Sequence, residues 1–206
     1  MQIRIANIVE NSVVDGEGVR TVLYTQGCHL ACKGCQNQAL WDAAGGRVVD
    51  VYDLAKHLVS LSQAHHNYTI QGGEPTNQPH ALGLLMHLIK EFDPKAHIVV
   101  YTGHTWEDLI YTGAKFYLFL YADVVVDGPF IAEQDDPFIM WRGSRNQRPI
   151  DVRQTLIRGE VVKLDWDSPR LVIGSDGAIS LPVGLVKDFE EIGEVEKSRR
   201  CGDWRS

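Results

Sequence analysis

The sequence predicts an α/β protein built on a parallel sheet, followed by a small α+β appendage. Short β-branched, apolar runs alternate with segments whose apolar residues recur at helical spacing, a pattern typical of βαβ units. Glycine-rich or cysteine-rich segments follow the expected strands, at 27–35, 72–76, 102–103 and 127–130. Ligands of parallel sheets bind beyond the carboxyl ends of the strands, so we expect these four segments to converge on one site.

The first part of the chain predicts three strands, at 2–9, 20–25 and 68–71. Two glycines mark a tight turn before the second strand. Asp50 is placed to cap a helix that runs to about residue 64, because apolar residues recur there at helical spacing.

The next part predicts a helix at 80–92, a buried strand at 97–101 and a strand within 116–126 that ends at Asp127. A capping box at 105–108 opens a short helix between the two strands. Asp127 itself is interpreted as a cap at the strand end.

The character of the sequence changes after Gly143. This portion predicts strands at 160–164 and 170–173, a hairpin turn at 175–178 and a charged helix at 183–195. None of its residues forms a motif with a recognisable chemistry.

The composition is that of a globular protein, with 44% hydrophobic and 23% charged residues. A net charge of −7 argues against nucleic acid as the main partner. Neither a secretory signal nor a membrane span is evident. We therefore expect a cytoplasmic protein, and in that reducing compartment clustered cysteines bind metals or act in catalysis.

Three cysteines, Cys28, Cys32 and Cys35, lie in one loop with the spacing C-x3-C-x2-C. Thiolates this close repel one another unless a cation holds them. Structural zinc needs four ligands, and the remaining cysteine, Cys201, lies in the charged tail. A four-iron cluster normally has four cysteine ligands, so three would leave one iron open for a substrate or cofactor. The spacing favours an iron–sulfur cluster over zinc, with a disulfide as the remaining alternative.

The segment Gly72-Gly73-Glu74-Pro75 follows the next expected strand. The two glycines would let the backbone come close to a ligand, because no Cβ is in the way. Glu74 could accept a hydrogen bond from an ammonium group. A plain strand-to-helix turn explains these residues equally well.

Taken together, these motifs resemble the radical S-adenosylmethionine (SAM) superfamily. Its signature is C-x3-C-x2-C after the first barrel strand and a GGE-type motif after the next, and both match here in order and separation. Within it, the chain resembles the activating proteins of anaerobic (class III) ribonucleoside-triphosphate reductase. That likeness lies in residues 15–20, 32–37, 100–103, 126–130 and 141–147.

The resemblance covers about residues 3–152. It implies a partial (β/α)6-type barrel as a radical SAM core in residues 1–152, with residues 153–206 as a C-terminal extension of unknown role. Cys28, Cys32 and Cys35 would then bind three irons of a [4Fe–4S] cluster, and SAM would chelate the fourth.

The same resemblance implies the cofactor contacts. Gly34, Cys35 and Gln36 would line SAM beside the cluster, while Gly72, Gly73 and Glu74 would position its methionine end. An electron from the cluster would cleave SAM, and the 5′-deoxyadenosyl radical would take a hydrogen atom from a glycine of the partner.

The implied partners are the large subunit of the anaerobic ribonucleotide reductase and an electron donor such as flavodoxin, with no nucleic acid and no membrane. Gln36 stands where the family often has an aromatic residue, and Glu17 where proline is common. These departures leave open another glycyl-radical enzyme or a small molecule as the substrate.

The metal can be tested directly. We expect the protein to be brown when purified without oxygen, and Cys201→Ser to leave its iron content and visible absorbance unchanged. A zinc module that uses Cys28, Cys32, Cys35 and Cys201 would instead be colourless, carry one zinc and lose it in Cys201→Ser.

Overall fold

The structure is a computed structural model that describes residues 1–112, 116–167, 172–173 and 179–180. The chain divides into two compact units, Met1–Trp166 and Asp167–Ser206. The first unit therefore continues past residue 152, and the domain boundary placed there by the sequence stays a prediction. No described helix has the length and hydrophobicity that crossing a membrane requires.

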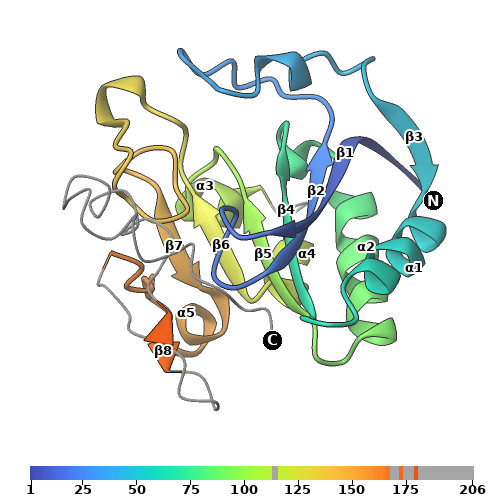
Figure 1. Ribbon diagram of the computed structural model, residues 1–206. Coiled ribbons are helices and arrows are strands. Elements are labelled where there is room, and N and C mark those ends of the chain that lie inside the picture. The colour runs from blue at the N-terminus through green and yellow to red at the C-terminus, as the bar shows by residue number, and fades with distance from the viewer. Residues whose placement is uncertain (113–115, 168–171, 174–178, 181–206) are drawn as a thin grey trace, which may run out of the picture. The chain divides into compact units, whose positions relative to one another are not determined.

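A mixed sheet of seven strands forms the first unit, in the order β3-β1-β2-β4-β5-β6-β7 (Figure 1). Strands β2, β4, β5 and β6 are parallel, β1 pairs antiparallel with β2 and β3, and β7 pairs antiparallel with β6. The α/β class and the parallel centre of the sheet are thus confirmed. The strands are β1 (Gln2–Ser12), β2 (Arg20–Thr25), β3 (Arg47–Asp50), β4 (Asn67–Gly72), β5 (His97–Tyr101), β6 (Val124–Asp127) and β7 (Arg148–Asp151).

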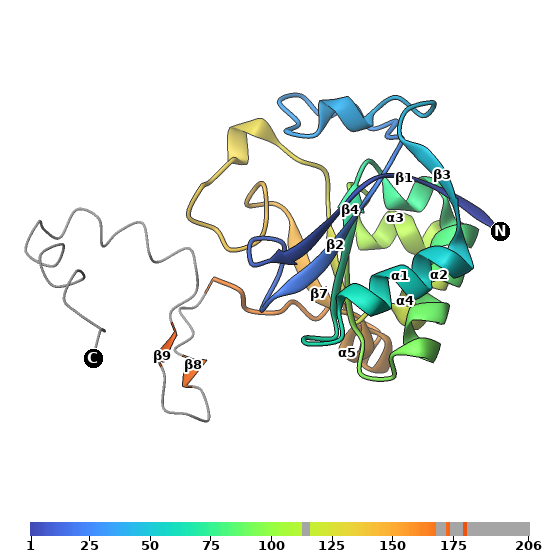
Figure 2. The same ribbon diagram turned by 45° about the vertical axis from the view of Figure 1, so that its right-hand side comes forward.

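Helices α1 to α4 lie on one face of this sheet (Figure 2). Their buried side chains form a continuous core with Ile70, Ile98 and Val100, which point to the same face from β4 and β5. The helices are α1 (Val51–Leu61), α2 (Pro79–Phe92), α3 (Trp106–Tyr111), α4 (Phe116–Tyr121) and α5 (Val152–Arg158), with 3-10 turns η1 (Gln38–Leu40), η2 (Pro75–Asn77) and η3 (Ala132–Gln134).

The opposite face of β5 and β6 is covered by a smaller cluster. Val99, Val124 and Val126 pack there with Trp166. Trp141 meets Trp166 edge to face, with ring centroids 5.2 Å apart. Both faces of the central strands are therefore buried, as expected of parallel strands.

Several local predictions are confirmed. The strands at 20–25 and 97–101 have the predicted bounds, and β6 ends at Asp127. The Asp50 side chain caps α1 by accepting from the backbone N–H groups of Tyr52 and Asp53. Thr105 likewise caps α3 through the N–H of Asp108.

Other elements differ from the prediction. The prediction of a strand at 160–164 is wrong, because within this range only Lys163 pairs with another segment, through an isolated bridge to Ile150. Strands β3 and β7 and helix α5 were not predicted, and the apolar run from Phe116 begins as helix α4. In the second unit, β8 (Val172–Ile173) and β9 (Ile179–Ser180) pair antiparallel, as the hairpin prediction requires. The hairpin turn at 175–178, residues 170–171 of the predicted strand and the helix at 183–195 lie outside the described residues.

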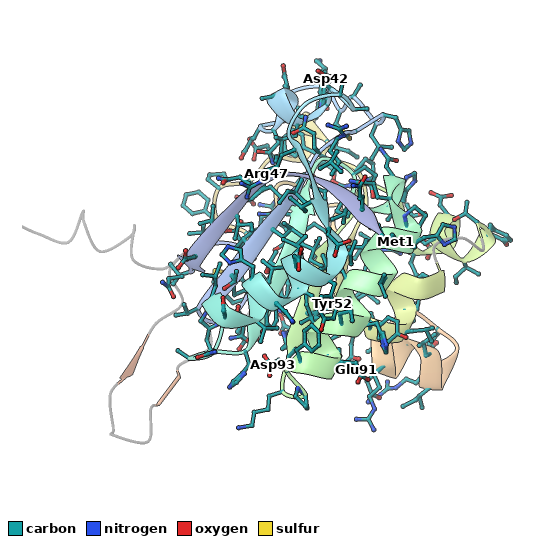
Figure 3. The ribbon with its side chains drawn as sticks, turned by 90° about the vertical axis from the view of Figure 1, so that its right-hand side faces the viewer. Met1, Asp42, Arg47, Tyr52, Glu91 and Asp93 are labelled. Atoms are coloured by element: carbon teal, nitrogen blue, oxygen red, sulfur yellow. The ribbon has the colours of Figure 1, made fainter. Side chains whose placement is uncertain are left out.

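The amino ends and the carboxyl ends of the parallel strands lie at opposite ends of the first unit. Figure 3 shows Asp42, in the segment that follows the cysteine loop, at one end of the unit, and Asp93, in the turn after α2, at the other. The carboxyl ends of β2, β4, β5 and β6 face the first of these ends.

Arg20 is buried at the start of β2, with 1% of its surface exposed. Its guanidinium donates to Thr69 Oγ1 at 2.7 Å and to the carbonyl oxygens of Tyr68 and His97 at 2.6 and 3.1 Å. Burial lowers the pKa of Arg20 to about 10, so it remains charged at neutral pH. The side chain thus joins the beginnings of three parallel strands, β2, β4 and β5.

We expect Arg20→Met to destabilise the fold by about 2–4 kcal/mol, because it leaves buried carbonyl oxygens without donors. Chemical unfolding followed by tryptophan fluorescence measures this. Arg153→Met removes an exposed arginine on α5 and should change stability by less than about 0.5 kcal/mol. Equal effects for the two variants would contradict this role of Arg20.

Candidate functional site

The cysteine loop leaves the carboxyl end of β2 and is held in place by the chain that follows it. The backbone N–H groups of Gly27 and Cys28 donate to the carbonyl oxygens of Leu40 and Trp41 at 2.9 and 3.1 Å. The chain therefore folds back across the start of its own loop, above the end of the sheet (Figure 2).

The three thiols are free and half-buried. Burial raises the pKa of the Cys28 thiol; the backbone N–H groups of Leu30 and Ala31 oppose the shift, and the negative charge of Glu74 adds to it. The N–H of Asn37 points at the sulfur of Cys35, 3.4 Å away. Hydrogen bonds of this kind tune the potential of cysteine-bound iron–sulfur clusters.

Among the described residues, no three His, Cys, Asp or Glu side chains converge as ligands of a single metal ion. A cluster binds each thiolate through a different iron, so its ligands need not meet at one point. Three free thiols in one short loop fit a cluster in their chemistry and spacing. Cys201 lies outside the described residues.

The Gly72–Glu74 turn packs backbone against backbone on the start of the cysteine loop. The N–H of Gly73 donates to Thr25 O at 2.9 Å, and the N–H of Glu74 donates to Gly27 O at 2.8 Å. A Cβ on Gly73 would lie 2.5 Å from Gly27 O, and one on Gly72 would lie 2.9 Å from the backbone of Thr25. Glycines are therefore required here for the contact between the two turns, independently of any ligand.

Glu74 also links this turn to the one after β5. Its carboxylate accepts from the Thr102 hydroxyl and from the N–H of Gly103, both at 2.9 Å. A Cβ on Gly103 would overlap the side chain of Leu30 in the cysteine loop. The rings of His29 and His104 also meet, with centroids 5.5 Å apart.

The turn after β6 completes the group. Gly34 lies against Phe130 and Ala132, to which a Cβ would come within 3.5 and 3.3 Å. The N–H of Gly128 donates to His104 O at 2.9 Å. All four segments predicted to converge thus meet at one edge of the sheet.

The Arg142–Gln147 segment supports that last turn. Asn146 Nδ2 donates to Pro129 O at 2.7 Å, and Gln147 Nε2 donates to Gly128 O at 3.1 Å. Gln147 Oε1 accepts from the N–H of Gly143 at 2.8 Å. The asparagine and glutamine of this motif therefore hold the 128–130 turn in place.

Asp127 is fully buried at the end of β6. Its Oδ2 accepts from the N–H of Trp106 at 2.6 Å, and its carboxylate pairs with Arg148. It was interpreted as a cap at the strand end; from that position its carboxylate binds the first turn of α3.

A pocket of about 610 Å³ lies at the opposite edge, where β5 and β6 begin, and is lined in part by His97, Asp123 and Leu156. It contains none of the site residues predicted from the sequence. Thr102 and Leu30 lie in two of the segments predicted to converge here, but the contacts of Thr102 with Glu74 and of Leu30 with Gly103 were not predicted.

An α/β unit with a three-cysteine loop at the carboxyl edge of its parallel strands defines an iron–sulfur protein with a single cluster loop. In agreement, the family model described as "4Fe-4S single cluster domain" matches residues 14–150.

The comparison with curated proteins is more specific. Relatives named anaerobic ribonucleoside-triphosphate reductase-activating protein are 35% identical over 140 residues in Haemophilus influenzae and 30% identical over 141 residues in Escherichia coli K12. These matches cover 66% of this chain and 89% and 90% of the relatives. The chain belongs to the family of anaerobic ribonucleoside-triphosphate reductase-activating proteins. Among solved structures, QueE from E. coli matches with a TM-score of 0.41 and 19% identity, over 51% of this chain and 54% of that one.

The contact between the two turns can be tested by Gly73→Ala. The new Cβ would meet backbone rather than a movable side chain, so we expect the variant to bind much less iron after anaerobic reconstitution. Gly159→Ala introduces strain at a left-handed residue with open space around it and should cost about 1 kcal/mol of stability with full iron content. Iron per chain measures the difference, and full iron in Gly73→Ala would refute the steric argument.

Proposed function

We propose that this chain activates an anaerobic ribonucleoside-triphosphate reductase by generating a glycyl radical on it, using a [4Fe–4S] cluster and SAM. The observation that carries the proposal is the cysteine loop held against the Gly72–Glu74 turn. This contact brings three thiols and a glycine-rich turn to one edge of the sheet. The family's name gives the substrate class.

Cys28, Cys32 and Cys35 are the cluster ligands in this proposal. They supply three thiolates, which leaves one iron of a four-iron cluster for SAM. The N–H of Asn37 would stabilise the thiolate of Cys35, since a hydrogen bond to the charged form favours that form.

SAM would lie across the outer surface of the cysteine loop and the turn after β4, which are themselves in direct contact. Gly34, Cys35 and Gln36 would line it on the cluster side. The backbone of Gly72, Gly73 and Glu74 would face its methionine end, where carbonyl oxygens can accept from an ammonium group.

When bound, the cluster and SAM together supply the electron transfer and the 5′-deoxyadenosyl radical that takes a hydrogen atom from a glycine of the reductase. The chain itself binds and orients both groups and excludes water from them. None of these steps requires an acid–base pair from the chain.

Finer features extend the same proposal. The parallel strands and their helices would form a partial (β/α)6-type radical SAM barrel, and the open side of this barrel would face the reductase. Flavodoxin, or a donor of similar potential, would supply the electron. The protein would work in the cytoplasm, without nucleic acid as a partner.

We expect the anaerobically reconstituted protein to release 5′-deoxyadenosine from SAM when dithionite is added, and to raise a glycyl-radical signal in the electron paramagnetic resonance (EPR) spectrum of its reductase. Serine in place of Cys28, Cys32 or Cys35 should abolish both activities, because each loses a cluster ligand. Cys201→Ser should keep both. An intact cluster that leaves SAM uncleaved would rule out this function, and cleavage without a glycyl radical would point to another substrate.

A further inference from the structure

The Glu74 carboxylate is already occupied by hydrogen bonds within the chain. Its Oε1 accepts from the N–H of Thr76 and from the hydroxyl of Thr102, each at 2.9 Å. Its Oε2 accepts from the N–H of Gly103, also at 2.9 Å. Only 1% of the residue is exposed. A buried carboxylate needs such partners, and here two different turns provide them.

These two turns contact the cysteine loop on both sides of Cys28. On one side, the N–H of Glu74 donates to Gly27 O at 2.8 Å. On the other side, Gly103 lies so close to Leu30 that a Cβ would overlap the leucine side chain. The carboxylate therefore joins the two supports between which Cys28 is held.

We propose that Glu74 is a positioning residue for the cysteine loop, and that its carboxylate does not bind the methionine ammonium of SAM. The side chain locks the turn after β5 to the turn after β4, and the two turns together fix the place of Cys28. This inference rests on the proposed function, because it takes Cys28 to be a cluster ligand.

The hydrogen-bond pattern explains why the position needs an acid. Both oxygens face a backbone N–H, one from Thr76 and the other from Gly103. Glutamine offers one acceptor and one NH2 donor. In either orientation of its amide, the NH2 group would face a backbone donor and one of the two bonds would be lost.

The test compares Glu74→Gln, Thr102→Val and a matched control, Thr76→Val, in the full-length chain. Thr102→Val removes a hydroxyl that donates to Glu74 and leaves the charge in place. Thr76→Val removes a hydroxyl from the same site, but Thr76 Oγ1 has no hydrogen-bond partner among the described residues. Thr102→Val is the decisive variant, because Glu74→Gln also removes a negative charge near the Cys28 thiol.

The first readout uses metal-free protein. The rate of alkylation of Cys28 by iodoacetamide, followed by peptide mass spectrometry, reports how firmly the loop is held. We expect a several-fold faster rate in Thr102→Val and in Glu74→Gln, and the wild-type rate in Thr76→Val. A wild-type rate in Thr102→Val would overturn the inference, even if Glu74→Gln failed to fold.

The second readout uses the reconstituted protein. We expect both Glu74→Gln and Thr102→Val to change the EPR spectrum of the reduced cluster before SAM is added, and to lower kcat for SAM cleavage with little change in KM. A raised KM for SAM in Glu74→Gln alone, with unchanged spectra, would assign the carboxylate to SAM and contradict the proposal. If wild-type protein with an intact cluster failed to cleave SAM, the proposed function would fail, whereas the thiol rates would still decide the role of Glu74.

Discussion

The contact between the Gly72–Glu74 turn and the start of the cysteine loop is the constraint on which the rest of the site depends. It consists of backbone alone, with Gly73 and Glu74 donating to Thr25 and Gly27. No side chain fits between the two turns, since a Cβ on Gly73 would lie 2.5 Å from Gly27 O. Main-chain hydrogen bonds therefore fix Gly27, the neighbour of Cys28, and the Glu74 carboxylate joins this contact to the turn after β5.

The sheet makes this contact possible. Strands β2 and β4 pair in parallel with Thr25 opposite Gly72, so their last residues reach the edge together. A slip of one residue would turn every side chain to the other face, and the buried core of β4 and β5 against the helices penalises such a slip. Arg20 fixes the other end of the same strands. The register that buries the core is thus the register that aligns the two turns.

Local signals in the sequence account for what could be predicted. Strand β2 and strand β5 are apolar and β-branched, and Asp50 and Thr105 mark helix starts through their own side chains. Strands β3 and β7 have four residues each, with charged residues at both ends, so their pairing depends on neighbouring strands that are distant in sequence. The segment 160–164 was predicted as a strand, but its apolar residues divide between the two cores: Val161 packs against the helix-side core and Leu164 against the cluster around Trp166.

The site was predictable in its residues but not in their contacts. The cysteine spacing and the glycine pair are visible in the sequence, and they identify the chemistry. Thr102 and Gly103 donate to Glu74 across sequence separations of 28 and 29 residues, and no local sequence pattern predicts these hydrogen bonds. From the sequence alone, a glycine pair suggests space for a ligand, whereas in the structure the backbone of Thr25 and Gly27 fills that space.

The most direct measurement is a crystal structure of the anaerobically reconstituted protein with SAM. Our account predicts that the N–H of Glu74 still donates to Gly27 O and that the Glu74 carboxylate still holds Thr102 and Gly103. A structure in which the turn has left Gly27 and the carboxylate binds the SAM ammonium would contradict it.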